Sequence, residues 1–249
     1  MTFSGQHIVI TGASTGIGKA AAAQIVKGGG KVTLIARRSD LLKALCDELG
    51  ANAKWAAADV GDQAQLIAAL DSAVAQNGAI DGLFLNAGTG GTFAPLETYS
   101  DDNFDTLMAV NMKAPFWAAR HVLPAMTARC KGSIVITGSL ASERGMPMNV
   151  GYVMSKHAVL GLARAAAIEA APHGVRVNCL LPGFIATPLL DTVPQDQLPA
   201  LAANVPQGRL GTAAETAEVA AFLLSDAASH VTGQGWAVDG GVLGTLTVR

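Results

Sequence analysis

Charged side chains are scarce in this sequence of 249 residues. Only 14% of the residues are Asp, Glu, Lys or Arg, whereas half are hydrophobic. A typical soluble domain has about a quarter charged residues. A sheet that is buried on both faces would account for the shortage, and so would surface that is covered in an oligomer. The formal net charge is −2, and no basic run stands out beyond Arg37-Arg38, so we expect no nucleic-acid partner.

Long hydrophobic runs are also missing. The runs His7–Thr11 and Ser133–Thr137 are far too short to cross a bilayer. The first six residues lack a basic segment followed by a long apolar core, so we expect no signal peptide. Cys46, Cys130 and Cys179 do not have the spacing of a metal site or a redox pair. We therefore expect a cytoplasmic protein with reduced thiols, without a metal ion and without membrane insertion.

Short apolar runs alternate with alanine-rich helical stretches along the chain. We predict strands at His7–Thr11, Lys31–Ala36, Ala53–Ala58, Gly82–Asn86, Ser133–Thr137, Val175–Leu180 and Trp236–Val238. We predict helices at Gly16–Lys27, Ser39–Leu49, Asp62–Gln76, Val150–Ala171 and Ala214–Leu224. A long helix is expected from about Asp102 to Cys130, with Pro115 and Pro124 bending or interrupting it.

This alternation predicts an α/β fold. We expect a doubly wound, Rossmann-like parallel sheet of about seven strands with helices on both faces, in one domain over residues 1–249. Such sheets bind ligands beyond the carboxyl ends of their strands, so the segments after strands are the places to search for chemistry. Phe184–Pro206 follows a strand and contains three prolines, and it is expected to form a substrate lid.

A glycine-rich turn follows the first predicted strand. Its sequence is Thr11-Gly12-Ala13-Ser14-Thr15-Gly16-Ile17-Gly18, and a helix is expected to start within it. Glycines allow the backbone to pass close to a pyrophosphate, and a helix N-terminus offers N–H groups and partial positive charge to the anion. A plain glycine-rich turn is the alternative, but the strand before it and the helix after it favour a dinucleotide site.

Two arginines directly follow the second predicted strand. Sites that bind a free ribose 2′-hydroxyl generally place an acid here, whereas a 2′-phosphate favours arginine. Because Ala36 is neutral and Arg37 and Arg38 follow it, we predict a preference for NADP(H). The alternative is that both arginines are ordinary surface charges.

Three further residues have the chemistry of proton transfer. Tyr152 lies four residues before Lys156, so a helix places both side chains on one face, and Ser139 follows the strand Ser133–Thr137. A carbonyl oxygen that gains negative charge needs a proton donor and a fixed hydrogen bond. We expect the Lys156 ammonium to lower the pKa of the Tyr152 phenol from its ordinary value of about 10. A chance Tyr–Lys pair on a helix is the alternative.

Taken together and in order, these motifs resemble those of the short-chain dehydrogenase/reductase superfamily, in its compact single-domain branch. The resemblance covers nearly the whole chain. It rests on the turn Thr11–Gly18, Asp59-Val60, Asn86-Ala87-Gly88, Asn111, Ser139, the Tyr152–Lys156 pair, Asn178, Pro182-Gly183 and Thr232-Gly233-Gln234.

The resemblance assigns roles to individual residues. It implies an active centre of Asn111, Ser139, Tyr152 and Lys156, in which Asn111 interrupts a helix and holds water in a proton relay. It implies cofactor contacts through Gly12, Ser14, Thr15, Gly16, Ile17, Gly18, Arg37, Arg38, Asp59, Val60, Asn86, Ala87, Gly88, Tyr152, Lys156, Pro182, Gly183, Ile185 and Thr187. Within that set, Asp59 matches the position that contacts adenine, and Ile185 and Thr187 the pair that holds the nicotinamide carboxamide.

Two departures from the family pattern are visible. Leu85 stands where the family often has a first asparagine before Asn86. Ser14 and Thr15 fill the turn where NADP-preferring members often add a basic residue, which leaves Arg37 and Arg38 to determine cofactor selectivity.

The substrate side is less defined by the sequence. The runs Gly183–Thr187 and Gly208–Gly211 resemble those of 3-oxoacyl-carrier-protein reductases, which dock an acidic carrier on surface arginines. His173 stands where one such arginine is expected and Cys130 lies close to another, so the carrier question stays open. A hydrophobic ketone or secondary alcohol is the expected substrate. We expect its pocket to be walled by the residues after Ser139, the segment after Gly88 and the lid, with the candidates Leu140, Met146, Met148, Phe184, Leu189 and Leu190.

The sequence therefore predicts an NADP(H)-dependent carbonyl reductase or alcohol dehydrogenase. An NAD-linked alcohol dehydrogenase and a non-catalytic NADP(H)-binding regulator are the alternatives. The apolar composition and the resemblance also predict a homo-oligomer, a tetramer, in which the helices near Asn103–Cys130 and Val150–Ala171 pair across one interface and the C-terminal strand across another.

Overall fold

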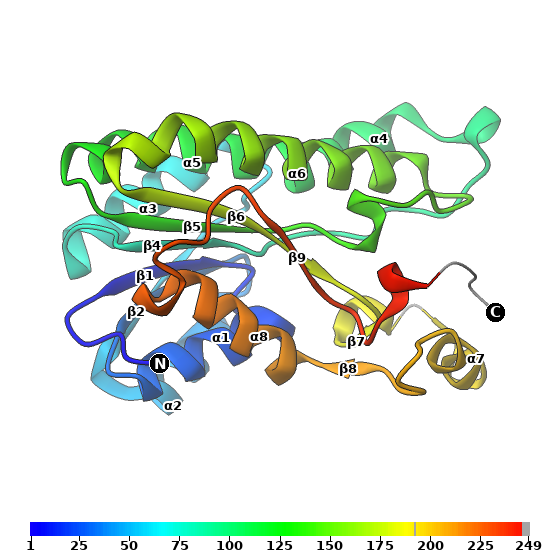
Figure 1. Ribbon diagram of the computed structural model, residues 1–249, viewed down its shortest axis with the longest axis horizontal. Helices are drawn as coiled ribbons and strands as arrows, with labels where there is room; N and C mark the ends of the chain where they lie inside the picture. Colours follow the sequence, from blue (N-terminus) through cyan, green and yellow to red (C-terminus); the bar gives the residue numbers. More distant parts are fainter. Residues whose placement is uncertain (192, 246–249) are drawn as a thin grey trace.

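One parallel sheet of seven strands forms the centre of the molecule (Figure 1). The structure is a computed structural model that describes residues 1–191 and 193–245. The strand order is β3-β2-β1-β4-β5-β6-β9. The strands are β1 (His7–Thr11), β2 (Lys31–Ala36), β3 (Ala53–Ala57), β4 (Gly82–Leu85), β5 (Gly132–Thr137), β6 (Val175–Pro182) and β9 (Gly235–Val238). This architecture confirms the predicted doubly wound, Rossmann-like fold.

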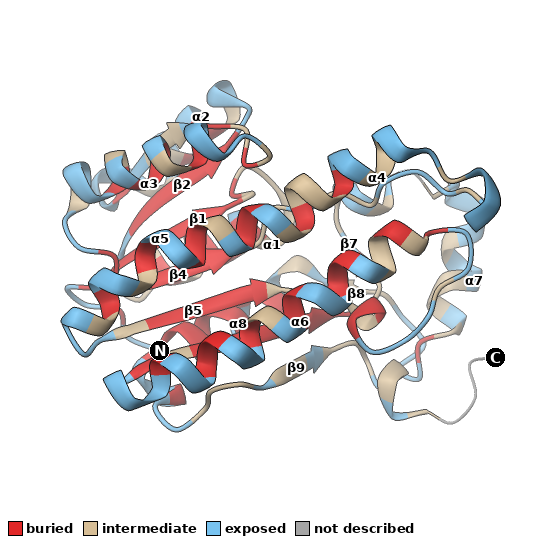
Figure 2. Cartoon of the chain, turned by 90° about the horizontal axis from the view of Figure 1, so that it is seen from above, coloured by how far each residue is buried: buried red, intermediate tan, exposed pale blue. Residues whose placement is uncertain are grey.

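Helices cover both faces of the sheet (Figure 1). One face carries α3 (Gln63–Asn77), α4 (Asp101–Met108), α5 (Ala114–Ala128) and α6 (Val150–Ala170), and the other carries α1 (Gly16–Lys27), α2 (Ser39–Leu49) and α8 (Ala213–Leu224). Each face has its own apolar core, and the central strands are buried between the two cores (Figure 2). Burial of the sheet on both sides explains the near-continuous apolar strands and contributes to the low content of charged residues.

The long helix expected after β4 is interrupted once. Between α4 and α5 the backbone forms a π-helical turn at Ala109–Lys113. Pro115 follows this turn and has no N–H to donate to the Asn111 carbonyl, so a regular α-helical bond is impossible there. Pro124 lies inside α5, which continues past it. The interruption therefore lies beside Pro115, and Pro124 does not interrupt the helix.

Local hydrogen bonds explain why α3 begins one residue later than predicted and why β6 ends two residues later. Asp62 caps α3 rather than opening it, because its carboxylate accepts from the Gln65 N–H at 3.1 Å. Strand β6 runs on to Pro182, two residues past the predicted end, because Pro182 still pairs with Val238 of β9.

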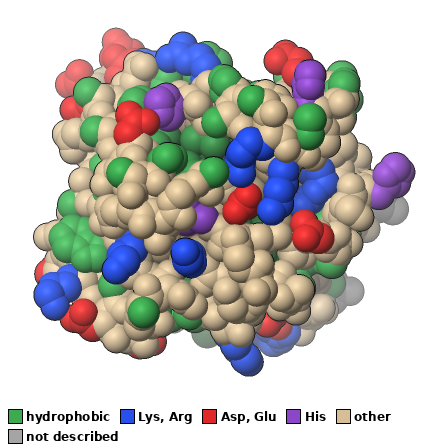
Figure 3. Space-filling view, turned by 90° about the vertical axis from the view of Figure 1, so that its left-hand side faces the viewer, with side chains coloured by type: hydrophobic (Ala, Val, Ile, Leu, Met, Phe, Trp, Pro, Cys, Tyr) green, Lys and Arg blue, Asp and Glu red, His purple; other side chains and the backbone are tan. Residues whose placement is uncertain are grey.

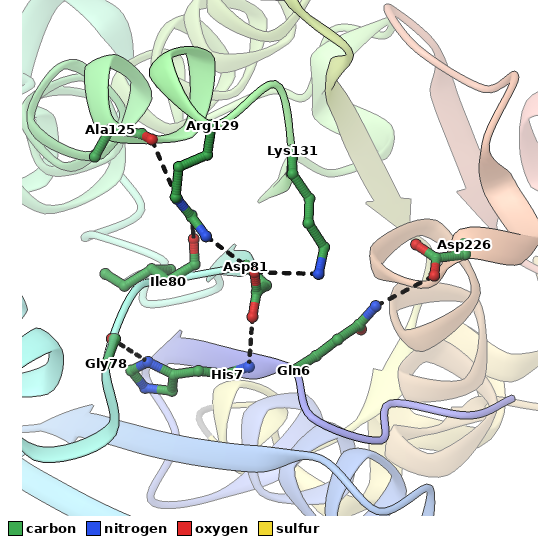
Figure 4. Close-up of polar contacts among 9 residues, drawn as sticks. All are labelled: Gln6, His7, Gly78, Ile80, Asp81, Ala125, Arg129, Lys131 and Asp226. Carbon is green, nitrogen blue, oxygen red and sulfur yellow. Dashed lines mark hydrogen bonds and ion pairs between the residues drawn. The ribbon is translucent and has the colours of Figure 1, made fainter.

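A polar cluster closes the amino-terminal end of the sheet, on the face seen in Figure 3, where basic and acidic side chains are interspersed. Asp81, directly before β4, accepts from the Arg129 guanidinium at 3.1 Å and from the His7 N–H at 3.0 Å, and Lys131 lies 3.5 Å away (Figure 4). Arg129 also donates to the carbonyl of Ile80. These bonds tie the starts of β1, β4 and β5 together, far from the carboxyl ends of the strands.

The segment predicted as a lid extends beyond the carboxyl ends of the strands (Figure 1). It contains the short strand β7 (Ile185–Ala186), which pairs with β8 (Gly211–Thr212), and helix α7 (Leu198–Ala203). Thr192 of this segment lies outside the described residues. Within the described part of the chain, no helix combines the length and hydropathy needed to cross a bilayer.

Candidate active site

A cleft of about 500 Å³ opens at the carboxyl ends of the strands. It lies where the strand order reverses between β1 and β4, the position at which sheets of this kind hold their ligands. Its lining includes these residues named from the sequence: Gly12, Ser14, Thr15, Gly16, Ile17, Arg37, Arg38, Asp59, Val60, Asn86, Ala87, Gly88, Ser139, Tyr152, Lys156, Pro182, Gly183, Ile185 and Thr187. The structure thus brings together residues from seven separate segments.

The glycine-rich turn packs too closely against its neighbours to accept side chains. Gly12 has a left-handed backbone with φ +65°, and a Cβ on it would lie 2.7 Å from the Ala87 Cα. A Cβ on Gly18 would lie 2.4 Å from the Gly12 carbonyl oxygen. Gly18 therefore does not line the cleft; it allows α1 to approach the turn, so that the N-terminus of α1 faces the cleft.

Asn86 holds the ends of β1 and β4 together. Its side-chain amide donates to the carbonyls of Thr11 and Gly12, each at 3.3 Å, and its backbone N–H donates to the Thr11 hydroxyl at 3.0 Å. The predicted Asn-Ala-Gly turn is thereby fixed against the glycine-rich turn. Leu85, the departure from the family pattern, is 3% exposed and belongs to the core.

Ser139, Tyr152 and Lys156 meet at the other end of the cleft. Tyr152 and Lys156 lie one turn apart on α6, and Ser139 caps a short helical turn after β5. The Ser139 hydroxyl forms a hydrogen bond with the Tyr152 hydroxyl that opposes the effect of burial on the tyrosine pKa. Two hydroxyl groups are therefore close enough to hold one oxygen atom of a ligand.

The pKa of Tyr152 differs from the expectation that the charge of Lys156 lowers it. The ammonium lies over the face of the tyrosine ring, 5.6 Å from its centroid, and donates to the Thr137 carbonyl at 2.8 Å. Burial raises the pKa of Tyr152 above its ordinary value, and the hydrogen bond with Ser139 only partly opposes this effect. The predicted lowering is thus wrong, because burial outweighs the effects that favour the phenolate.

Burial also sets the charge state of the neighbours of Tyr152. It lowers the pKa of Lys156 to about 8, so the ammonium still prevails at neutral pH. It raises the pKa of the Cys179 thiol beneath the site to about 12, so this thiol is neutral. At neutral pH the site therefore presents a protonated phenol beside a buried cation.

Asn111 lies outside the cleft lining, in the π-helical turn, with 1% of its surface exposed. Its side-chain amide pairs with the backbone of Thr89: the Thr89 N–H donates to Oδ1 at 2.8 Å, and Nδ2 donates to the Thr89 carbonyl at 2.9 Å. Nδ2 also lies 3.3 Å from the Ser155 hydroxyl. The side chain thus joins the π-helical turn to the segment after Gly88 and to α6.

The substrate side of the cleft involves only part of the predicted wall. Leu189 and Leu190 line the cleft, as does Thr89 of the segment after Gly88. Thr106 and Val110 also line it, and the sequence did not point to them. Leu140, Met146, Met148 and Phe184 are absent from the lining.

The sequence analysis also missed Asn149, although an asparagine directly before a predicted helix is the usual sign of an N-cap.

Comparisons with known proteins bear on the family of the chain. A family model described as enoyl-(acyl carrier protein) reductase matches residues 12–243. The chain is 37% identical to 2,5-dichloro-2,5-cyclohexadiene-1,4-diol dehydrogenase of Sphingobium indicum, over 96% of this chain and 97% of that protein. It is 38% identical to cyclohexanol dehydrogenase of Acinetobacter sp. (96% and 95%) and 36% identical to a 3-oxoacyl-[acyl-carrier-protein] reductase of Salmonella typhimurium (97% and 99%).

A solved structure shows the same architecture. The crystal structure of levodione reductase superimposes with a TM-score of 0.94 at 33% identity, covering 96% of this chain and 98% of that one. Matches of this length and identity show the family as well as the fold. The chain belongs to the short-chain dehydrogenase/reductase family, whose members are oxidoreductases that use nicotinamide cofactors.

Proposed function

We propose that the protein transfers a hydride between NADP(H) and a carbonyl or secondary alcohol, with Tyr152 as the general acid and base. The observation that carries this proposal is the meeting of the Tyr152 and Ser139 hydroxyls in one cleft with a glycine-rich turn. The turn fits a dinucleotide, because its backbone at Gly12 and Gly16 and the N-terminus of α1 line the cleft, where N–H groups can meet a pyrophosphate. A bound nicotinamide ring would supply or accept the hydride.

The residues of the chain supply the proton chemistry. Burial keeps Tyr152 protonated, so in reduction its hydroxyl donates a proton to the carbonyl oxygen. The Ser139 hydroxyl donates a second hydrogen bond to the same oxygen and fixes its position. Lys156 places positive charge beside the phenolate that remains, and Asn111 is proposed to complete the proton relay behind it. In alcohol oxidation each transfer runs in reverse.

A preference for NADP(H) over NAD(H) is proposed from the end of β2. Arg37 and Arg38 line the cleft there, whereas an acid that would bind a ribose 2′-hydroxyl is missing from this position. The adenine end of the cofactor is assigned to Asp59 and Val60, and the nicotinamide end to Pro182, Gly183, Ile185 and Thr187.

We propose an alicyclic ketone or secondary alcohol as the substrate. Leu189 and Leu190 provide an apolar wall, and two of the relatives act, by their names, on a cyclohexanol and a cyclohexadiene diol. An acyl-carrier substrate is disfavoured, because His173 stands where a docking arginine is expected and Arg129, beside Cys130, is engaged with Asp81 and Ile80. Residues 184–206 are proposed to close over the substrate.

Turnover of a carbonyl panel tests the function. The panel contains cyclohexanone, cyclohexanedione, 2-hexanone and a 3-oxoacyl thioester, each with NADPH and with NADH. We expect NADPH-dependent reduction of the ring ketones, and loss of at least 1,000-fold in kcat for Tyr152→Phe with unchanged NADPH binding. Binding without turnover in either protein would instead support the regulator, and equal efficiency with NADH would support the NAD-linked enzyme.

A cytoplasmic homotetramer is proposed as the working form. Phe116 on α5 and Met154 and Ile168 on α6 are exposed by 42%, 48% and 74%, on the helices expected to pair between subunits. Burial of such side chains stabilises association. Sedimentation at micromolar concentration tests this proposal, and a single monomeric species would overturn it.

A further inference from the structure

The segment Gly88–Ala94, which starts at the glycine of the Asn-Ala-Gly turn, has no regular secondary structure, yet its first two residues line the cleft. We call it the wall segment. A Cβ on Gly90 would lie 3.6 Å from the Leu189 side chain, so the wall segment also borders the proposed lid. A stretch without ladder bonds needs other partners to hold its backbone polar groups in one place.

Asn149 provides one of these partners from the start of α6. Its Nδ2 donates to the Gly90 carbonyl at 2.7 Å. Its Oδ1 accepts from the Tyr152 backbone N–H at 3.3 Å and from the Tyr99 hydroxyl at 3.2 Å. With 1% of its surface exposed, Asn149 makes these bonds away from water. One side chain therefore joins the helix that carries Tyr152 to the wall segment.

The residue before Asn149 strengthens the connection. Met148 is held in a left-handed conformation with φ +64°, which is unusual for a side chain other than glycine. Its carbonyl accepts from the Ala94 N–H at 2.7 Å. The two residues before α6 thus form hydrogen bonds with the wall segment at Gly90 and Ala94, and Asn111 forms hydrogen bonds with it at Thr89.

We propose that Asn149 is a positioning residue that sets the wall segment, and through it the lid at Leu189, relative to the Tyr152 hydroxyl. It acts on the substrate side of the site, since its partners are Gly90 and Tyr99 rather than the glycine-rich turn. Loss of the bond to Gly90 releases the wall segment and weakens ketone binding, whereas the cofactor end is untouched. The kinetic test of this inference rests on the proposed function, whereas the exchange measurement described below does not.

Two substitutions separate positioning from helix capping. Asn149→Asp and Asn149→Ser both keep an oxygen that can cap α6. The aspartate replaces the donor to Gly90 with an acceptor, and the serine is too short to reach that carbonyl. Tyr99→Phe removes only the hydroxyl bond to Asn149 and serves as a third variant should the others fold poorly. Ser100→Ala is the matched control, because it removes the cap of the neighbouring helix α4. In the wild type the Ser100 hydroxyl accepts from the Asn103 backbone N–H at 3.2 Å.

Steady-state kinetics with cyclohexanone and NADPH give the first readout. We expect KM for cyclohexanone to rise about tenfold in Asn149→Asp and Asn149→Ser and about twofold in Tyr99→Phe, the range for one lost hydrogen bond. The Kd for NADPH stays within twofold, and Ser100→Ala matches the wild type. Unchanged KM in all three variants, or equal losses in ketone and NADPH binding, overturns the proposal.

Hydrogen–deuterium exchange gives a second readout that requires no turnover. We expect faster exchange in peptides covering residues 88–94 and 187–190 of Asn149→Asp, with the start of α6 as protected as in the wild type. Faster exchange confined to residues 150–156 would show a capping role alone and overturn the proposal. If the wild type reduces no ketone, the function fails while this measurement still decides the role of Asn149.

Discussion

The guanidinium of Arg38 donates to the Ser14 hydroxyl at 3.1 Å and reaches the Thr15 hydroxyl at 3.4 Å. Arg38 therefore braces the glycine-rich turn. Arg37 lines the same cleft but makes no hydrogen bond or ion pair with the residues that the structure describes. Its charge is accordingly available for a ligand anion, so the two adjacent arginines have different roles.

This difference predicts separate effects of two alanine substitutions. Arg37→Ala should raise KM for NADPH by about 10- to 100-fold, the loss expected for a charge-assisted hydrogen bond to phosphate, and leave KM for NADH within twofold. Arg38→Ala should weaken both cofactors by a few fold, because it loosens a turn that both use. Cofactor titrations of both variants check this, with the surface variant Arg120→Ala as control. A loss of NADH binding in Arg37→Ala would contradict the division of roles.

The close packing of the glycine-rich turn predicts that Gly18→Ala is harmful. A Cβ there would meet the Gly12 carbonyl at 2.4 Å, so α1 or the turn has to move. We expect a destabilisation of about 1–3 kcal/mol, as for other overpacked sites, and at least tenfold weaker NADPH binding. Gly145→Ala is the matched control, because nothing lies within 4 Å of the added atom. Thermal melting and NADPH fluorescence titration measure both effects; similar behaviour of the two variants would show that the turn yields easily.

The sequence allowed the sheet and most of the cleft to be predicted, because their signals are local. Apolar runs mark the strands, and glycines such as Gly12 mark a backbone that side chains would obstruct. The π-helical turn is partly predictable for the same reason, since Pro115 removes an N–H from the helix. Its exact place depends on how Asn111 binds Thr89, 22 residues away in the chain.

The sequence could not establish the electrostatics of the site. The four-residue spacing of Tyr152 and Lys156 predicts proximity, but it does not show that burial outweighs the effect of a nearby charge on the Tyr152 pKa. The position of the ammonium also depends on the Thr137 carbonyl, which lies on β5 rather than on α6. The role of Asn149 likewise depends on Gly90, a glycine without a local signal of its own.

Because Lys156 is a buried cation, we expect it to support activity at the expense of the stability of the fold. Its pKa falls from the ordinary 10.5 to about 8, so the unfolded chain binds more protons between these values and the stability of the wild type rises with pH there. Below pH 8 the buried charge costs up to about 3 kcal/mol. Lys156→Met removes this cost, but it also removes the hydrogen bond to the Thr137 carbonyl. The unpaired carbonyl reduces the gain in folding free energy by about 1 kcal/mol.

We therefore expect Lys156→Met to lower kcat at least 100-fold while raising the melting temperature at pH 7 by a few degrees. The gain should shrink as the pH approaches 10, because the wild-type lysine is then neutral when folded. Calorimetry across this pH range checks the trend, with the exposed Lys27→Met as control. A lower melting temperature for Lys156→Met at pH 7 would show that the ammonium stabilises the fold.

His7 predicts acid sensitivity at the opposite end of the sheet. Burial lowers its pKa below 6.5, and the hydrogen bond to the Gly78 carbonyl and the charge of Asp81 only partly oppose this, while Lys31 adds to it. The neutral ring donates to Gly78 through Nδ1 at 3.0 Å and accepts from the Thr33 hydroxyl through Nε2 at 2.8 Å. Protonation of the ring adds an N–H at Nε2, where the Thr33 hydroxyl donates in the neutral form. Two donors then face each other, so this contact has to rearrange.

Because the folded pKa lies below the unfolded one, the unfolded chain binds more protons as the pH falls through 6.5. The stabilisation is present above pH 6.5 and is lost as the pH drops toward the folded pKa of His7. Urea unfolding from pH 8 to pH 5 should therefore show a steeper loss of stability for the wild type than for His7→Gln, which keeps a donor and an acceptor but cannot titrate. His173→Gln, on the exposed turn after α6, is the control and should follow the wild type. Parallel curves for all three proteins would mean that other groups cause the acid sensitivity.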